Sequence, residues 1–237
     1  MVSSAGRPRA CLTPVGIREN GCSVSVRHIL LLRHGQTDAN AGGVLQGHRP
    51  TSLNALGRQQ AERLAQRLGT TTPAIEVLVS SDLPRALQTA EPIARVLKLD
   101  IVVDAAWRER GFGDLEGQTL GDLEIWRTAS GTIDPPGGES SAVFRQRVHA
   151  ALTSVVERYA AHRCVAVVTH GGVVRSVLHQ LGSGRLPLAH LQEPPVVDPI
   201  ANASILHVTV DARGAWSALR VNDDAHLEGM TTALDAG

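Results

Sequence analysis

Two apolar segments that lie far apart in the chain each end in a His-Gly pair. Ile29-Leu-Leu-Leu runs directly into Arg33-His34-Gly35, and Cys164-Val-Ala-Val-Val runs into Thr169-His170-Gly171. Each apolar run has the length of one buried strand, and in an open α/β sheet ligands bind at the carboxyl ends of such strands. The pair therefore predicts two imidazoles side by side at one edge of a parallel sheet, whereas a single Arg-His-Gly would indicate little.

The rest of the chain alternates between strand-like and helix-like segments. Strands are expected near 27–33, 75–79, 101–103, 165–168, 204–210 and 216–221, and helices near 54–68, 83–97 and 141–161, with a further helix starting in the His170-Gly-Gly turn. This alternation implies right-handed crossovers and a sheet covered on both faces. We expect an α/β fold, a three-layer sandwich with a mostly parallel central sheet and a helical cap insert.

The insert is expected at about 111–162, where the strand–helix rhythm breaks and a short helix near 120–128 is predicted. The chain has 237 residues, of which 43% are hydrophobic, so it can bury one substantial core. We therefore expect a single domain at 26–228, preceded by a flexible tail at 1–25 and followed by a frayed end at 229–237.

The charge and cysteine content argue against several classes of partner. The 23 basic and 23 acidic residues balance, so nothing indicates a nucleic acid or a membrane surface as a partner. No apolar stretch approaches the roughly 20 residues of a membrane span. Three irregularly spaced cysteines (Cys11, Cys22 and Cys164) argue for a reducing compartment. We expect a cytoplasmic protein.

His34 and its neighbours have the chemistry of a phosphate site. An imidazole directly after a strand is either a nucleophile that attacks phosphorus or a residue that only shapes the turn; Arg33 and a second His-Gly favour the nucleophile. Such an imidazole must be neutral, and nearby guanidinium groups disfavour its charged form. Arg85 is expected in the first turn of a helix, where free N–H groups already attract anions.

Glu109 is the candidate proton donor. The alkoxide that leaves a phosphate ester needs a proton, which a carboxylic acid can supply. Glu116 is the rival carboxylate, although a loop role in which it pairs with a nearby arginine suits it better. No HExxH pattern, Asp-rich ligand cluster, P-loop or dinucleotide fingerprint is present, so neither a metal site nor a cofactor is expected.

Taken together, these motifs resemble the histidine phosphatase superfamily, whose fold the cofactor-dependent phosphoglycerate mutases share. The resemblance covers roughly residues 27–227. Its motifs are Leu32-Arg33-His34-Gly35-x-Thr37-x-x-Asn40, Gln46-Gly47, Leu53-x-x-x-Gly57-x-x-Gln60-Ala61, Ser80-Ser81-Asp82-Leu83-x-Arg85-Ala86-x-x-Thr89-Ala90, Glu109-x-x-Phe112-Gly113-x-x-Glu116-Gly117, Pro136-Gly-Gly-Glu-Ser140 and His170-Gly171-Gly172-x-x-Arg175. The loop after Gly47 departs from the family pattern, since Pro50 and Ser52 stand where an Asp and a Pro are usual.

The resemblance implies a role for each matching residue. His34 would be the phosphorylated nucleophile, and Glu109 the proton donor and later base. Arg33, Arg85 and His170 would form the phosphate pocket. Further substrate contacts would come from Thr37, Asn40, Gln46, Gly47 and Gly171.

The same family contains both phosphatases and mutases. Mutases hold a doubly anionic acid with a Lys shortly after the acid Glu and with an Arg pair, but this chain has no Lys after Lys98 and no adjacent Arg-Arg. Gly172 also stands where mutases tend to place Asn, and Phe112-Gly-Asp-Leu-Glu-Gly117 is similar to the phosphatase branch. We expect a metal-independent phosphomonoesterase that acts through a phosphohistidine.

The expected partner is a small phosphorylated metabolite, because the insert would roof the pocket. The alternatives are a cofactor-dependent phosphoglycerate mutase and an inactive module that binds phosphorylated ligands; the module would require the loss of the nucleophile, acid or second histidine, all of which are present. The sequence leaves the substrate open, and it leaves open whether the protein is a homodimer.

Overall fold

The computed structural model describes residues 27–119, 134–183 and 199–230. Its strands are β1 (Arg27–Arg33), β2 (Val77–Ser80), β3 (Ile101–Val103), β4 (Cys164–Thr169), β5 (Ile205–Val210) and β6 (Trp216–Asp223). Its α-helices are α1 (Asp38–Ala41), α2 (Ala55–Gly69), α3 (Pro84–Leu97), α4 (Ser141–Arg158) and α5 (Gly171–Gly182). The short helix expected near 120–128, the expected tail at 1–25 and residues 231–237 of the expected frayed end lie outside the described residues.

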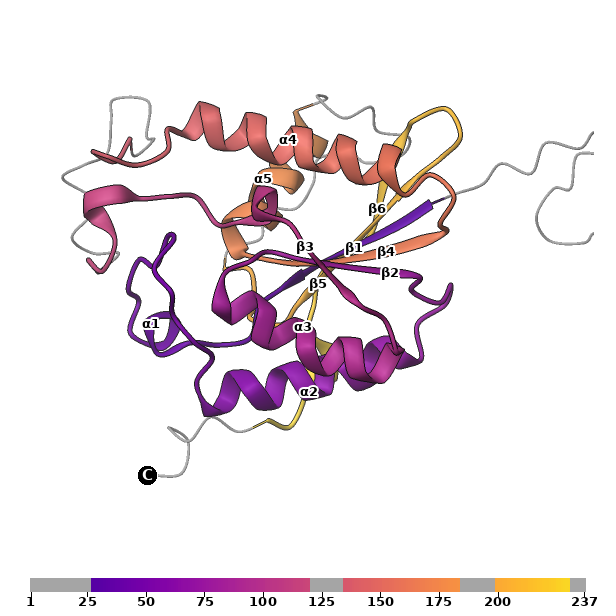
Figure 1. Ribbon diagram of the computed structural model, residues 1–237, viewed down its shortest axis with the longest axis horizontal. Helices are drawn as coiled ribbons and strands as arrows, with labels where there is room; N and C mark the ends of the chain where they lie inside the picture. The colour runs from indigo at the N-terminus through magenta and orange to yellow at the C-terminus, as the bar shows by residue number, and fades with distance from the viewer. Residues whose placement is uncertain (1–26, 120–133, 184–198, 231–237) are drawn as a thin grey trace, which may run out of the picture.

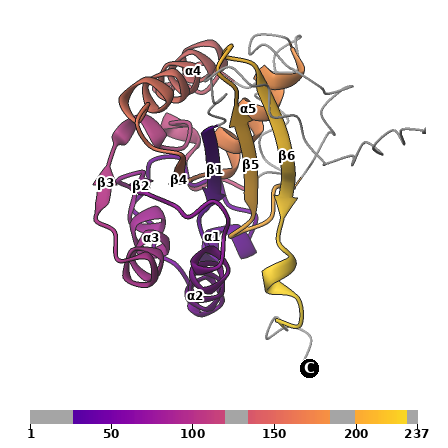
Figure 2. The same cartoon turned by 90° about the vertical axis from the view of Figure 1, so that its right-hand side faces the viewer.

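All six strands form one sheet in the order β3-β2-β4-β1-β5-β6. The first four of these are parallel to one another, while β5 and β6 are antiparallel to their neighbours. Helices α2 and α3 cover one face of the sheet, and α4 and α5 cover the other (Figures 1 and 2). This arrangement confirms the three-layer α/β sandwich with a mostly parallel sheet.

Strand β1 is buried on both faces because its apolar side chains alternate between two cores. Ile29 and Leu31 pack toward α4 and α5, whereas Leu30 and Leu32 pack toward α2 and α3. A strand in the middle of a doubly covered sheet has no solvent-facing side, which explains its unbroken apolar sequence.

Of the expected insert, residues 141–158 form α4, which packs across the sheet as part of an outer layer. Ser140 begins this helix by accepting a hydrogen bond from Val143 N, and Phe144, Val148 and Leu152 bury one face of it. The helix ends at Arg158, a little before the expected boundary.

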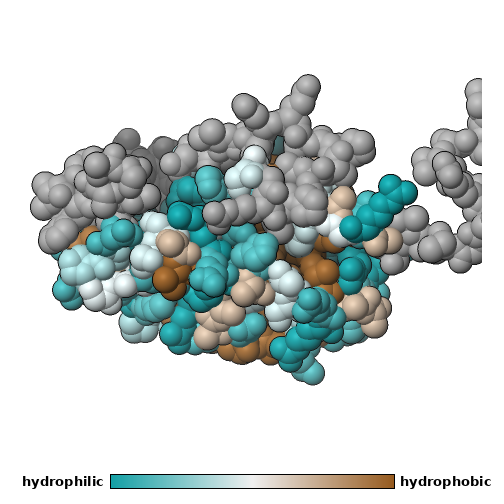
Figure 3. All heavy atoms as spheres, turned by 90° about the horizontal axis from the view of Figure 1, so that it is seen from above, coloured by the Kyte–Doolittle hydropathy of each residue, from teal (hydrophilic) through white to brown (hydrophobic). Residues whose placement is uncertain are grey.

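The surface over α4 is mixed in character. Seen from that side, the atoms not drawn in grey are mostly hydrophilic, and the hydrophobic residues among them are scattered (Figure 3). No helix in the described ranges is both long enough and apolar enough to cross a membrane.

Candidate functional site

The register between β1 and β4 brings the two histidines together. Arg33 pairs with Thr169 in parallel, so His34 and His170 leave the sheet at the same edge. Their ring centroids are 5.1 Å apart, with the ring planes at 61°. The two rings thus lie side by side, as the repeated strand-His-Gly pattern predicts, and both side chains are buried.

The ring of His34 is oriented by its own loop. Its Nδ1 lies 2.7 Å from Gly35 O, and because a carbonyl oxygen only accepts, Nδ1 carries the hydrogen and Nε2 keeps its lone pair. Burial, followed by the charges of Arg85 and Arg33, holds the pKa of His34 well below its usual range. The imidazole is therefore neutral near pH 7, as a nucleophile requires.

The loop that carries His34 lies directly on the first turn of α2. A Cβ built on Gly35 would be 2.4 Å from Gly57 O, so only glycine allows this approach. Asn54 begins α2 by accepting a hydrogen bond from Gly57 N at 2.8 Å. The Arg-His-Gly turn is thus fixed against a capped helix.

Two arginines flank the histidines, and both are held in place. Arg33 donates to Ile200 O, and Arg85 donates to Gly47 O at 2.8 Å and to Thr51 Oγ1 at 3.1 Å. Burial lowers the pKa of each guanidinium to about 10, so both remain charged at neutral pH. Arg85 stands in the first turn of α3, as expected from the sequence.

His170 is supported from behind by a serine. Its Nε2 lies 2.9 Å from Ser81 Oγ. A hydroxyl both donates and accepts, so Ser81 can donate its proton to Nε2 while its oxygen accepts from Leu83 N at 3.3 Å; in that arrangement Nδ1 carries the ring hydrogen. Burial and then Arg85 hold the pKa of His170 well below its usual range.

Three nitrogens around this site lack partners. The Nε atoms of Arg33 and Arg85 and the Nδ1 atom of His170 are buried and make no hydrogen bond with any described residue. An unsatisfied buried donor costs about 1–3 kcal/mol, so buried groups are normally paired. An anion with several acceptor oxygens, such as a phosphoryl group, would accept hydrogen bonds from all three donors. The two fixed guanidinium charges would also attract it.

Glu109 lines the same cavity as His34, and its carboxylate is held by two backbone N–H groups. Its Oε2 accepts from Gly172 N in the first turn of α5 and its Oε1 from Arg110 N, each at 2.9 Å. The loop that carries it is held by Arg147 of α4, which donates to Glu109 O at 3.2 Å and pairs with Glu139 at 2.7 Å. Glu109 is therefore positioned through its backbone as well as its side chain.

The predicted substrate contacts divide into two groups. Asn40, Gln46 and Gly47 line the same cavity as Arg33, His34, Arg85 and Glu109, and the cavity has a volume of about 180 Å³. Thr37 does not line it and instead forms the capping box of α1 with Asn40, while Gly171 lies beneath Arg33. Gln46 Oε1 accepts from Thr51 Oγ1 at 2.6 Å, which leaves its NH₂ group for a ligand.

Glu116 has a different role from the arginine pairing that the sequence suggested. Its Oε1 accepts from His48 N at 2.8 Å and from Phe112 N at 3.0 Å. It thereby joins the loop after Gly47 to the loop that carries Glu109, and in the described part of the chain its carboxylate pairs with no arginine side chain.

Sequence reasoning missed several residues that support the site. Asn202 donates to His34 O at 3.1 Å and to Asn40 Oδ1 at 3.2 Å, although it stands 168 residues after His34. Ser81 belongs to one of the sequence motifs, but the motif does not indicate its contact with His170. Arg147 stands in a helix, and nothing in the sequence distinguishes it from a solvent-exposed arginine. In these three cases no pattern within the sequence reveals the contact.

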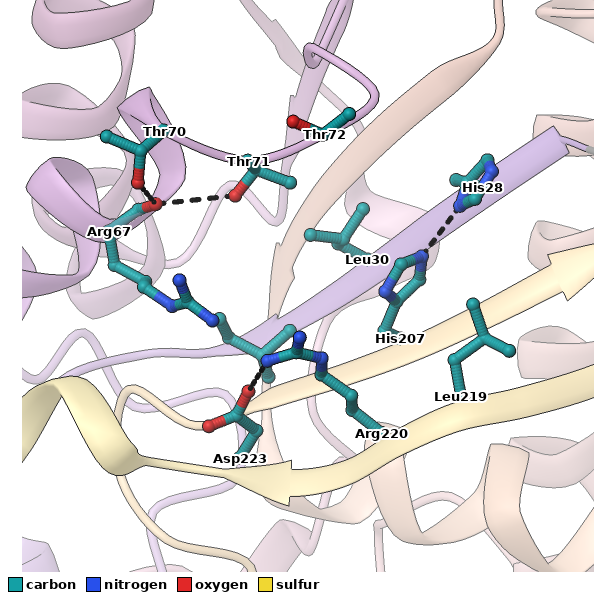
Figure 4. Close-up of a pocket in the computed structure, with 11 residues that line it drawn as sticks. His28, Leu30, Arg67, Thr70, Thr71, Thr72, His207, Leu219, Arg220 and Asp223 are labelled. Carbon is teal, nitrogen blue, oxygen red and sulfur yellow. Dashed lines mark hydrogen bonds and ion pairs between the residues drawn. The ribbon is translucent and has the colours of Figure 1, made fainter.

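A larger cavity of about 500 Å³ lies at the other end of β1. His28 and His207 meet there, with Nδ1 and Nε2 2.9 Å apart, and Arg220 pairs with Asp223 (Figure 4). His28 precedes His34 by six residues, about 20 Å along a strand, so this cavity is separate from the catalytic candidates.

Within the described ranges no three His, Cys, Asp or Glu side chains are grouped to hold a metal ion.

Comparison with known proteins agrees with this geometry. The model of the histidine phosphatase superfamily (branch 1) matches residues 29–224. The chain belongs to this superfamily. Phosphoglycerate mutase-like protein 4 of Arabidopsis thaliana is 35% identical over 215 residues, which cover 86% of this chain and 89% of the relative. Glucosyl-3-phosphoglycerate phosphatase of Mycobacterium tuberculosis is 36% identical over 193 residues, covering 75% and 83%.

The solved structures give the same assignment. A mycobacterial glucosyl-3-phosphoglycerate phosphatase complexed with VO3 superposes with a TM-score of 0.69 at 29% identity, covering 82% of this chain and 98% of that one. This chain is thus an enzyme that hydrolyses phosphomonoesters, which both the family match and its phosphatase relatives support.

Proposed function

We propose that this phosphatase hydrolyses a small phosphorylated metabolite in the cytoplasm without a metal ion, and that His34 carries the phosphoryl group between two steps. The three buried donors without partners support this proposal most strongly. They surround a neutral imidazole whose Nε2 lone pair is free of its own loop. The small cavity supports a small-molecule substrate.

In the first step, His34 Nε2 attacks phosphorus, and the N–P bond forms as the bond to the leaving oxygen breaks. Glu109, in its protonated form, gives its proton to that oxygen. In the second step Glu109 takes a proton from water, the water oxygen attacks phosphorus, and the N–P bond breaks to release phosphate and neutral His34. Acid–base catalysis of this kind contributes about 10²–10⁴-fold.

Arg33, Arg85 and His170 hold the three non-bridging oxygens during both steps. Because these donors are fixed before the substrate arrives, they stabilise the charge of the transition state without reorganising. Gln46 and Asn40 line the same cavity and supply further polar contacts.

The test is phosphate release from a panel of phosphoglycerates, sugar phosphates and nucleoside monophosphates, with EDTA present. Glucosyl-3-phosphoglycerate and 3-phosphoglycerate come first, because the names of relatives mention them. We expect turnover and an alkali-stable phosphoenzyme that disappears in His34→Ala. Turnover that requires a divalent metal, or equal turnover in His34→Ala, would contradict the proposal, and isomerisation of phosphoglycerate without phosphate release would favour a mutase.

A further inference from the structure

A second cavity of about 310 Å³ continues from the catalytic one. Both are lined by Glu109, Phe112, Gly172 and Arg175. The second is completed by residues of α4, α5 and the loop after Glu109: Arg110, Ser141, Phe144, Arg145, Ser176 and His179. His34 lines only the first cavity, so the second one begins at the proton donor and extends away from the nucleophile.

This placement fixes which part of a substrate the second cavity would receive. In an in-line displacement the leaving oxygen lies opposite the attacking nitrogen, and here it must also lie within reach of Glu109. The rest of the alcohol continues from that oxygen, and the cavity that shares Glu109 is the space available to it.

The lining of this cavity has an apolar part that is held rigidly. The ring of Phe112 faces the Arg110 guanidinium at 5.2 Å, and the ring of Phe144 faces that of Arg147 at 5.1 Å. Arg147 is itself fixed to Glu139. Two aromatic rings held in this way offer flat apolar contact to the body of a leaving group.

The rest of the lining is polar, and three arginines (Arg110, Arg145 and Arg175) give it positive charge. Arg145, Arg175 and His179 come from two facing helices, and Glu109 is the only carboxylate among the described lining residues. The guanidinium of Arg145 makes no hydrogen bond or ion pair with any described residue. The pKa of Arg110 is lowered mainly by burial, and the nearby charge of Arg145 acts in the same direction. A partly buried arginine of this kind suits a planar anion such as a carboxylate.

We propose that this second cavity is the leaving-group subsite, and that it selects phosphomonoesters whose alcohol carries a carboxylate beyond an apolar segment, with Arg145 as the anion contact. This inference rests on the proposed function of the adjacent cavity. This chain lacks the Lys and the adjacent Arg pair that mutases of the family use, so the arginines on α4 and α5 would supply the positive charge here.

The test compares two aryl esters of nearly the same shape, 4-carboxyphenyl phosphate, whose para group is charged, and 4-carbamoylphenyl phosphate, whose para group is neutral. We expect kcat/KM to favour the carboxylate by about tenfold or more, the value of one charge-assisted hydrogen bond. In Arg145→Gln the ratio should fall toward one. The matched control is Arg158→Gln, which removes the same charge from the end of α4, where Arg158 contacts Tyr159 instead of the cavity.

The outcomes separate this subsite from the catalytic assignment. A ratio near one in the wild-type enzyme, or a ratio that Arg145→Gln leaves intact, overturns the subsite, while a phosphoenzyme that depends on His34 keeps the proposed function. An equal fall of the ratio in Arg158→Gln also overturns it, because the effect is then one of overall charge. Failure of both esters to release phosphate overturns the subsite, while turnover on the metabolite panel still decides the proposed function.

Discussion

The carboxylate of Glu109 and the backbone of Gly172 are in direct contact, with Oε2 accepting from Gly172 N at 2.9 Å. A Cβ built at this glycine would lie 2.1 Å from Glu109 Oε1. The first turn of α5 therefore holds the proposed proton donor only because position 172 has no side chain.

Gly172→Ala should lower kcat while leaving the fold at least as stable. The added methyl group displaces the carboxylate, whereas alanine inside a helix is favoured over glycine by about 1 kcal/mol. The loss should be largest for alkyl phosphates, whose leaving groups most need a proton, and smaller for p-nitrophenyl phosphate. The measurement is kcat for both esters beside Glu109→Gln; an equal loss for the two would speak against an acid role.

His34→Ala should abolish turnover and phosphoenzyme formation without unfolding the protein. The imidazole donates only to Gly35 O, so its removal leaves the rest of the sheet edge in place. The control is His149→Ala, which changes an exposed histidine of α4 whose partner is Gln180. Activity close to wild type in His34→Ala, with an unchanged thermal midpoint, would show that the nucleophile lies elsewhere.

Inorganic phosphate should raise the thermal midpoint of the resting enzyme. It supplies acceptors to the unpaired nitrogens of Arg33, Arg85 and His170, and a ligand that binds only the folded state stabilises by about 2.7 kcal/mol at 100 times its Kd. Arg33→Ala should remove most of this shift, whereas Arg27→Ala at the other end of β1 should keep it. A shift that survives Arg33→Ala would place the bound anion outside this cavity.

The folded enzyme should lose stability as the pH falls below 6.5. His34 and His170 have pKa values well below 6.5 when folded, because of burial first and then nearby arginines. Between the folded and unfolded pKa values the unfolded chain binds more protons, so acid favours unfolding, by up to about 1.4 kcal/mol per pH unit for each histidine.

Urea unfolding at pH 5.5 and 7.5 measures this dependence. His34→Ala should reduce the difference between the two pH values, although burial also lowers the pKa of His207, to about 4, which contributes in the same direction. A wild-type free energy of unfolding that rises on acidification would contradict the buried, neutral state of both histidines.

Arg147→Gln should reduce kcat more than it changes KM. Arg147 does not line the catalytic cavity but donates to Arg108 O and Glu109 O and pairs with Glu139, so it acts by positioning the loop. Its loss should therefore steepen the dependence of kcat on leaving-group basicity, an effect that general destabilisation would not produce. Arg147→Lys should restore little, because one ammonium group cannot span these contacts.

The sequence predicted the framework of the site because local patterns encode it. The apolar runs before His34 and His170 define two central strands, and parallel pairing brings their ends together without further information. Arg85 could be placed because Pro84 begins its helix.

Contacts between distant loops could not be predicted in the same way. Asn202 reaches His34 O through tertiary packing alone, and the α4 arginine that fixes Glu109 occupies a helix position like that of any solvated arginine. The role of Glu116 was misjudged because backbone N–H groups, which no sequence pattern displays, are the partners of its carboxylate.

The pairing of β1 with β4 has a consequence for how this enzyme can fail. Side chains alternate between the two faces of a strand, so a slip of one residue would turn His34 away from His170 and exchange the two sets of apolar β1 side chains between the cores. Catalytic activity therefore depends on the register of β1 against β4. A substitution that disturbs this register should abolish activity while much of the secondary structure persists.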